Sequence, residues 1–170
     1  MNARRALLVA LALLVRPVPL AALEDDERQP LHIEADAVEL DERQAQSLYV
    51  GNVDVRQGSM RILADEVLVH HRPDRRPSKI VAVGNPARYS QRVEGEPNEV
   101  RGRAQRMEYD AERDEIAFID QAVLTQGQDS FSSDRIVYHR ASARVRAGAS
   151  AQGRERVKIV IHPEPAPGDR

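Results

Sequence analysis

Three aspartates, Asp36, Asp65 and Asp134, are the side chains in this 170-residue sequence that first suggest acid–base chemistry. Glycoside hydrolysis uses a pair of carboxyl groups in such roles. All three aspartates, however, follow a small residue at equivalent places in an internal repeat, which favours a role in turns. No nucleophile elbow, phosphate-binding loop or zinc-binding helix motif occurs either. We therefore expect no catalytic site and no enzyme activity.

A second group of chemically capable residues is His70-His71, followed by three arginines. Two histidines could suggest a metal site, but neighbouring residues in a strand point to opposite faces. No carboxylate at ligand spacing completes a coordination set. The sequence also contains no cysteine, which excludes a disulfide scaffold, a thiolate metal site and a thiol nucleophile. We expect neither a metal nor a cofactor.

The composition describes one domain built from aliphatic residues. Of the 170 residues, 41% are hydrophobic and 31% charged, but only 4% are aromatic. The formal net charge of −2 argues against a strongly basic nucleic-acid-binding protein. We therefore expect no nucleic-acid partner and a core made mainly of Val, Ile, Leu and Ala.

Both termini are expected to lie outside the fold. Residues 1–22 have two early arginines, an apolar run from Ala6 to Val15 and small residues at the end, which is typical of a secretory signal peptide. The run is too short to span a bilayer. The charged residues 23–28 predict a flexible N-terminus, and the proline-rich residues 163–170 predict a disordered tail. Residues 29–162 then form the domain.

Alternation of apolar and polar residues predicts strands throughout this domain. Leu31, Ile33 and Ala35 alternate with polar residues, and the same period of two recurs around residues 53–55, 60–64 and 157–161. Turn signals separate the runs at Gly51-Asn52, Gly58-Ser59, Arg72-Pro73-Asp74, Gly84-Asn85-Pro86, Gly95-Glu96-Pro97, Gly127-Gln128 and Gly153.

The repeat predicts how these strands are arranged. In the unit from Ile33 to Leu40, the apolar positions slip by one residue at Ala35-Asp36, so the strand must bend there to keep both halves facing inward. Related units lie around residues 62–69, 102–109 and 131–138. Bends at this spacing predict an all-β fold of two antiparallel sheets hinged along one edge, either a jelly roll or a roll-shaped solenoid. Small aliphatic side chains with few aromatic ones would leave a slot between the two sheets that is suited to acyl chains. Many compact β-sandwiches share this composition, however.

The domain resembles the LptA (OstA) family of lipopolysaccharide-transport proteins. The resemblance spans roughly residues 29–163 and rests on six segments in order: residues 29–36, 49–58, 62–67, 84–89, 102–109 and 153–157. One departure is Asp120-Gln121, where the family usually carries Gly-Asn, which leaves the turn geometry at that point open.

The resemblance implies an open-edged β-jelly roll of two folded antiparallel sheets. It also implies a periplasmic protein that binds the lipid A part of lipopolysaccharide in an apolar groove. It also implies head-to-tail stacking of copies between an inner-membrane jelly-roll protein similar to LptC and an outer-membrane assembly similar to LptD and LptE. A cargo-free structural β-solenoid remains an alternative, and an envelope glycan hydrolase on a β-roll is a less favoured one.

The resemblance and the alternation together select the candidate site residues. The expected groove lining is Leu31, Ile33, Val38, Leu40, Ile62, Val67, Val69, Tyr89, Met107, Phe118, Phe131, Ile136 and Tyr138. The expected stacking edges are Leu31, His32, Ile33, Glu34 and Ala35 at one end, and Val157, Lys158, Ile159, Val160 and Ile161 at the other. Arg72, Arg75 and Arg76 are candidate contacts for lipid A phosphates, with a solvated loop as the plainer alternative.

Overall fold

The structure, a computed structural model, describes residues 26, 28–93 and 99–163. The expected signal peptide, the turn at Gly95-Glu96-Pro97 and most of the expected tail lie outside these residues. The described part is nearly all β, with one 3₁₀ turn, Gly148–Ala151. Its strands are β1 (His32–Glu34), β2 (Ala37–Asp41), β3 (Gln46–Gln57), β4 (Met60–His71), β5 (Pro77–Arg92), β6 (Glu99–Asp110), β7 (Glu115–Gln126), β8 (Asp129–His139), β9 (Arg144–Ala147) and β10 (Lys158–Val160).

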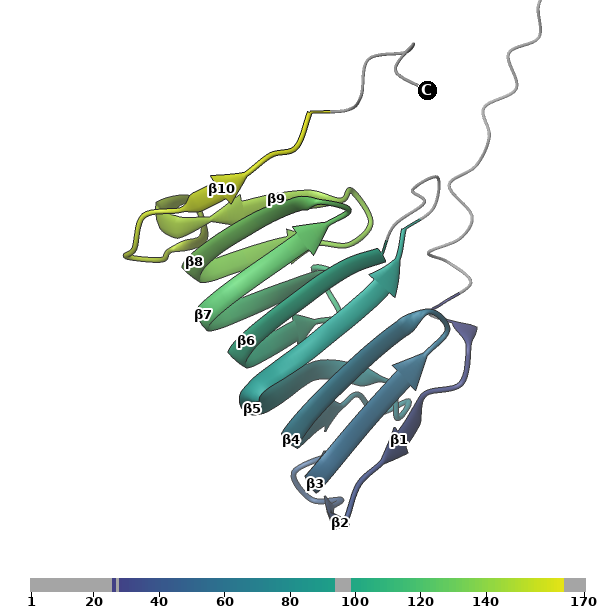
Figure 1. Ribbon diagram of the computed structural model, residues 1–170. Coiled ribbons are helices and arrows are strands. Elements are labelled where there is room, and N and C mark those ends of the chain that lie inside the picture. The colour runs from purple at the N-terminus through teal and green to yellow at the C-terminus, as the bar shows by residue number, and fades with distance from the viewer. Residues whose placement is uncertain (1–25, 27, 94–98, 164–170) are drawn as a thin grey trace, which may run out of the picture.

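All ten strands belong to one antiparallel sheet that does not close on itself. Its order is β1-β3-β4-β5-β6-β7-β8-β10, with β2 also beside β3 and β9 also beside β8. Figure 1 shows the strands stacked in chain order from β1 and β2 at one end to β9 and β10 at the other. The expected all-β, open-edged jelly roll is confirmed.

The long strands fold over on themselves at corners. The pairing register shifts between Val50 and Val53 in β3, and between Ile119 and Ala122 in β7. Gly51-Asn52 and Asp120-Gln121 fill these gaps, and all four residues have positive φ, from 46° to 82°. Asp120 and Gln121 differ in sequence from the family's usual Gly-Asn, but they adopt the same positive-φ backbone as Gly51 and Asn52. Non-glycine residues rarely adopt this conformation.

The corners correct one detail of the sequence prediction. Gly51-Asn52 and Gly84-Asn85-Pro86 were expected as turns between strands, but both lie inside single strands, β3 and β5. A corner can be made inside a strand because the bend alone reorients the chain, without reversing it.

The repeated aspartates supply hydrogen-bond acceptors at these corners. The Asn52 side-chain amide donates to Asp36 Oδ2 at 2.8 Å, and the Asn85 backbone N–H donates to Asp65 Oδ2 at 3.2 Å. The Arg154 backbone N–H donates to Asp134 at 2.6 Å and is the main cause that lowers the pKa of this carboxyl. The turn role predicted for these aspartates is confirmed.

The corners divide the sheet into two leaves that face each other. Leaf A contains β2, β9 and residues 46–50, 66–71, 77–83, 106–110, 115–119 and 135–139. Leaf B contains β1, β10 and residues 53–57, 60–63, 87–92, 99–103, 122–126 and 129–133. The described hairpins at the strand ends opposite the corners border an open side, which we call the mouth.

Candidate functional site

The predicted groove residues fall into three groups. Eight are fully buried between the leaves: Ile62, Val67, Val69, Tyr89, Met107, Phe118, Ile136 and Tyr138. Leu31, Ile33 and Phe131 are partly buried and pack against this core. Val38 and Leu40 are 57% and 66% exposed. They share an inward row with Tyr49 and Ser47, but β2 is the last strand of leaf A and no described strand covers them.

The interior between the leaves is filled by side chains. Tyr89 and Phe118 meet edge to face, with ring centroids 5.8 Å apart. Beside them, Met60, Ile80 and their neighbours enclose a cavity of only about 10 Å³. A packed core excludes both water and lipid. The slot expected from the thin aliphatic lining is therefore not preformed between the leaves.

A larger cavity lies at the mouth. It has a volume of about 800 Å³ and is bordered by the β3–β4 hairpin of leaf B and the β4–β5 hairpin of leaf A. Its apolar lining includes Leu31, Met60, Ile80 and Tyr109. Its basic lining is Arg28 together with Arg72, Arg75 and Arg76. Apolar surface beside several cations suits an amphiphile with an anionic head group.

The arginines are held by a tight hairpin at the end of β4. The Arg72 backbone N–H donates to the Arg76 carbonyl at 2.8 Å, and Arg75 has a positive φ of 65°. Arg76 lies 3.8 Å from the Asp74 carboxylate, and both side chains are largely exposed. Among the described residues, Arg72 and Arg75 have no carboxylate partner. These two guanidinium groups can therefore receive an anion.

The two neighbouring histidines make separate contacts. The His71 ring nitrogen Nε2 lies 2.7 Å from the Ser47 hydroxyl, and His70 lies 3.4 Å from the Gln46 amide. His71 also lines the mouth cavity, and its buried Nδ1 has no hydrogen-bond partner in the described part of the chain. Within the same residues, no group of three potential metal ligands is found.

A buried polar network joins the two leaves at the mouth. Arg140, 3% exposed on the leaf A side, donates from Nε to the Gln91 side-chain oxygen of leaf B at 3.2 Å. Its Nη1 lies 3.3 Å from the Asp114 carboxylate. The Tyr89 hydroxyl also donates to Gln91, and burial raises the pKa of this tyrosine far above its ordinary value. We call this network the Gln91–Arg140 bridge; the sequence analysis did not predict it.

Asp26 extends this network toward the N-terminus. Its carboxylate accepts hydrogen bonds from the Ser59 backbone N–H at 2.8 Å and from the Gln91 amide at 2.9 Å. Burial raises the pKa of Asp26, but hydrogen bonds from the Ser59 hydroxyl, the Gln91 amide and the Ser59 backbone N–H outweigh burial and leave the pKa below its ordinary value. Asp26 lies within residues 23–28, the segment expected to be a flexible N-terminus, and these contacts connect it to the β3–β4 hairpin and to β5.

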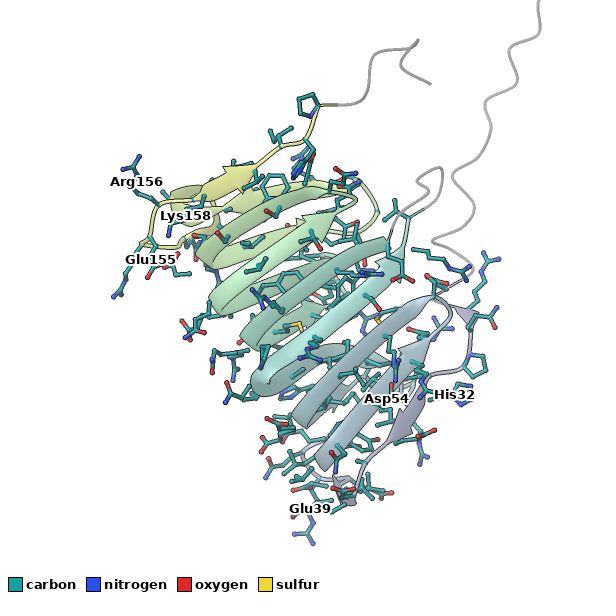
Figure 2. All side chains as sticks on the ribbon, viewed as in Figure 1. His32, Glu39, Asp54, Glu155, Arg156 and Lys158 are labelled. Carbon is teal, nitrogen blue, oxygen red and sulfur yellow. The ribbon has the colours of Figure 1, made fainter. Side chains whose placement is uncertain are left out.

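The free edges carry exposed apolar side chains. At the C-terminal end these are Ile159, Val160 and Ile161, between 52% and 68% exposed, and at the N-terminal end they are Val38 and Leu40. The predicted edges of leaf B are β1 and β10. Each leaf has its own pair of edges, so β2 and β9 also have one side that no described strand pairs with, and the sequence analysis missed these two edges. Figure 2 shows His32 and Glu39 at one end and Glu155, Arg156 and Lys158 at the other.

Within the described ranges, no helix is both long and apolar enough to cross a bilayer.

The comparisons with known proteins agree on one family. Residues 32–144, more than half of the chain, match the family described as "LptA/(LptD N-terminal domain) LPS transport protein".

Individual relatives support the same assignment. The lipopolysaccharide export system protein LptH of Pseudomonas aeruginosa is 29% identical over 84% of this chain and 85% of its own length. The export system protein LptA of Escherichia coli K12 is 33% identical over 78% of this chain and 71% of its own length. A crystal structure of LptH from P. aeruginosa, the "LptA homologous periplasmic component" of a lipopolysaccharide transport device, matches with a TM-score of 0.74 at 28% identity. That match covers 82% of this chain and 99% of the LptH chain. The chain belongs to the LptA/LptD N-terminal-domain family of lipopolysaccharide transport proteins.

Proposed function

We propose that this protein is a periplasmic carrier that binds lipid A at the mouth of the roll and passes it along a stack of jelly rolls. The observation that carries the proposal is the cavity of about 800 Å³, which joins apolar side chains to four arginines. In a family named for lipopolysaccharide transport, this combination fits the phosphorylated, acylated end of the lipid.

Each part of the cavity has a matching part of the lipid. Arg72 and Arg75, which lack carboxylate partners among the described residues, would donate charge-assisted hydrogen bonds to the phosphates. Leu31, Met60 and Ile80 would contact the first carbons of the acyl chains. Each CH₂ removed from water contributes about 0.8 kcal/mol, so even partial insertion of several chains would bind the lipid firmly.

Deeper insertion requires the leaves to separate. The core cavity beside Tyr89 and Met107 has a volume of only about 10 Å³, which is too small for an acyl chain. The Gln91–Arg140 bridge crosses the mouth and holds the leaves together there. Acyl chains entering the roll would displace this bridge and replace contacts between the leaves with contacts to lipid. The transported lipid would thus open its own groove.

The ladders of paired residues support head-to-tail stacking. In leaf B, the inward row that begins at Ile33 ends at Ile159, and the outward row that begins at Glu34 ends at Lys158. A second copy that continued this ladder would place β1 antiparallel to β10. Ile159 would then face Ile33, and Lys158 would face Glu34, an apolar pair inside and an opposite-charge pair outside.

Leaf A repeats the same arrangement. Its outward row that begins at Glu39 ends at Arg146, and the row that begins at Asp41 ends at Arg144. Continuation would again bring opposite charges together. Two N-terminal edges placed side by side would instead oppose acidic residues, so charge favours one polarity of stacking.

The two ends would also receive different partners. We propose that one end meets the LptC-like jelly-roll protein of the inner membrane and the other meets the LptD/LptE-like assembly of the outer membrane. Unpaired edge strands and exposed apolar side chains at both ends support strand addition by such partners.

Site-specific photo-crosslinking in living cells tests lipid binding. A photoreactive residue at Leu31, which lines the mouth cavity, should form an adduct with lipopolysaccharide. The same residue at Val83, 38% exposed on the outward side of leaf A, is the matched control and should form none. Substituting Arg72 and Arg75 with Gln should reduce the Leu31 adduct. A stacked protein without any Leu31 adduct would favour the cargo-free scaffold.

A further inference from the structure

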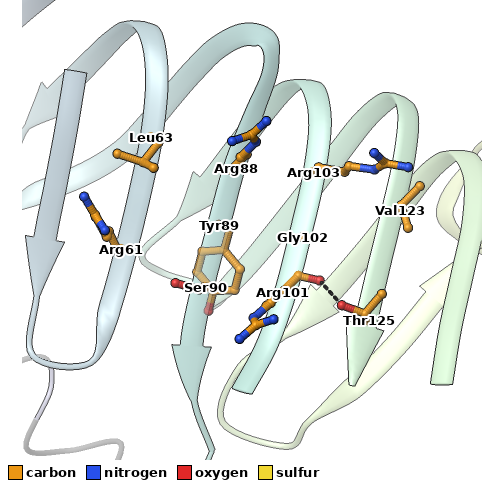
Figure 3. A pocket seen from close by; sticks show the side chains of 10 residues that line it. All are labelled: Arg61, Leu63, Arg88, Tyr89, Ser90, Arg101, Gly102, Arg103, Val123 and Thr125. Carbon is orange, nitrogen blue, oxygen red and sulfur yellow. Dashed lines mark hydrogen bonds between the residues drawn. The ribbon is translucent and has the colours of Figure 1, made fainter. Parts of the chain in front are cut away.

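The outer face of leaf B contains a second depression, away from the interior. It has a volume of about 390 Å³ and lies over the outward side chains of β4, β5, β6 and β7. Figure 3 shows two rows of side chains around it. One row is Leu63, Arg88, Arg103 and Val123, and the other is Arg61, Ser90, Arg101 and Thr125.

Two of the four arginines in these rows have no counter-charge. Arg88 and Arg103 are direct partners across β5 and β6, and neither has an ion pair or hydrogen bond among the described residues. Like charges directly opposite each other in a sheet are destabilising. The other two are neutralised within the face: Arg61 lies 2.7 Å from Asp54, and Arg101 lies 3.3 Å from Glu99.

The uncompensated pair indicates the charge of a ligand. Two guanidinium groups side by side match a dianion, and a phosphate monoester carries about −1.5 to −2 charges at pH 7. Its terminal oxygens can accept hydrogen bonds from both guanidinium forks. A carboxylate would neutralise only one of the two.

The surroundings indicate what the phosphate is attached to. The depression is larger than a phosphate group needs, and Leu63 and Val123 provide aliphatic surface on either side of the arginine pair. The Ser90 hydroxyl is available to hydrogen-bond a ligand, whereas the Thr125 hydroxyl donates to the Arg101 carbonyl at 3.3 Å. Aliphatic contact beside a free hydroxyl suits the ring of a sugar.

We propose that the outer face of leaf B binds a phosphorylated sugar, with its phosphate between Arg88 and Arg103. The site is separate from the mouth and goes beyond the lipid carriage proposed above, because Arg88 and Arg103 do not line the mouth cavity.

Titration of the purified protein with glucosamine 1-phosphate, followed by amide NMR shifts, tests the proposal. Saturable shifts should centre on Arg88, Gly102 and Arg103. Glucosamine without phosphate should cause none of them, and inorganic phosphate should bind more weakly than the sugar phosphate. Replacing both Arg88 and Arg103 with Gln should weaken binding by about tenfold or more, because each loses a charge-assisted hydrogen bond.

A second double variant controls for the loss of charge. Arg43→Gln with Arg113→Gln removes two exposed guanidinium groups from distant hairpins and should bind the sugar phosphate as the wild type does. Equal binding by the wild type and the Arg88/Arg103 variant would overturn the proposal. So would inorganic phosphate binding as tightly as the sugar phosphate. Lipid adducts at Leu31 should persist in the Arg88/Arg103 variant, which separates this site from the mouth.

Discussion

Charge reversal at the two edges of leaf B tests the proposed stacking and its register. Glu34 and Lys158 end the same outward row, so a second copy in the same ladder would place them opposite each other. Both side chains are exposed, and neither belongs to an ion pair within the described ranges. We expect Glu34→Lys and Lys158→Glu each to weaken self-association of the purified protein.

The expected change in self-association follows from the cross-strand pairing of Glu34 with Lys158. An opposite-charge pair across two strands contributes about 0.2–1 kcal/mol, and a like-charge pair costs a similar amount. One reversal therefore changes the association free energy by about 0.4–2 kcal/mol, or roughly 2- to 30-fold in Kd. Sedimentation velocity measures this change, and the difference from the wild type should shrink at high salt because exposed charges are screened.

A mixture of the two variants gives the sharpest test. In an equal mixture, the substituted N-terminal edge of one variant can meet the substituted C-terminal edge of the other, which restores an opposite-charge pair. Association should therefore recover on mixing. Glu66→Lys and Arg113→Glu change the charge equally, away from both ends, and serve as controls. If the mixture associates no more tightly than either variant alone, the proposed register is wrong.

Three further predictions concern stability. A Cβ atom at Gly102 would lie 2.1 Å from the buried Phe118 ring. Gly102→Ala should therefore lower the free energy of unfolding, measured in urea, by about 1–3 kcal/mol. A urea midpoint equal to that of the wild type would contradict this packing. Arg140→Met leaves Asp114 without its buried partner and should cost about 3 kcal/mol, lowering Tm by about 6–12 °C in calorimetry. Hydrogen bonds from two arginines lower the pKa of Asp54 to about 2 from 3.8. The stability that this carboxylate contributes should be full above about pH 4 and lost as the pH falls toward 2. Asp54→Asn should flatten that part of the curve of unfolding free energy against pH, and an unaltered curve would refute the assignment.

In the proposed carrier, the Gln91–Arg140 bridge would affect lipid release as well as stability. Arg140 is nearly inaccessible, and burying a charge is costly unless it is paired. In the proposed carrier, lipid that held the leaves apart would separate Arg140 from Gln91, and re-forming this contact would favour closure once the lipid left. The empty carrier would then return to the closed roll described above.

Much of the fold follows from local pattern in the sequence. Period-two alternation in segments such as Met60–Ala64 predicts strands with one dry face, because successive side chains point to opposite sides. The slip at Ala35-Asp36 predicts a bend, because an unbent strand would turn half of its apolar residues toward water. Both depend only on residues near each other in the chain, and the structure confirms both.

The site depends on contacts that no local pattern contains. Gln91 and Arg140 lie 49 residues apart and meet only because the leaves close on each other. Alternation places Val38 and Leu40 on an inward face, but it cannot tell whether another strand covers them. They are exposed because β2 ends its leaf. The sequence alone thus determines which face of each strand is apolar. Only the tertiary structure decides which apolar faces are covered within the molecule and which remain for a ligand or another chain, because coverage depends on strand order across the whole sheet.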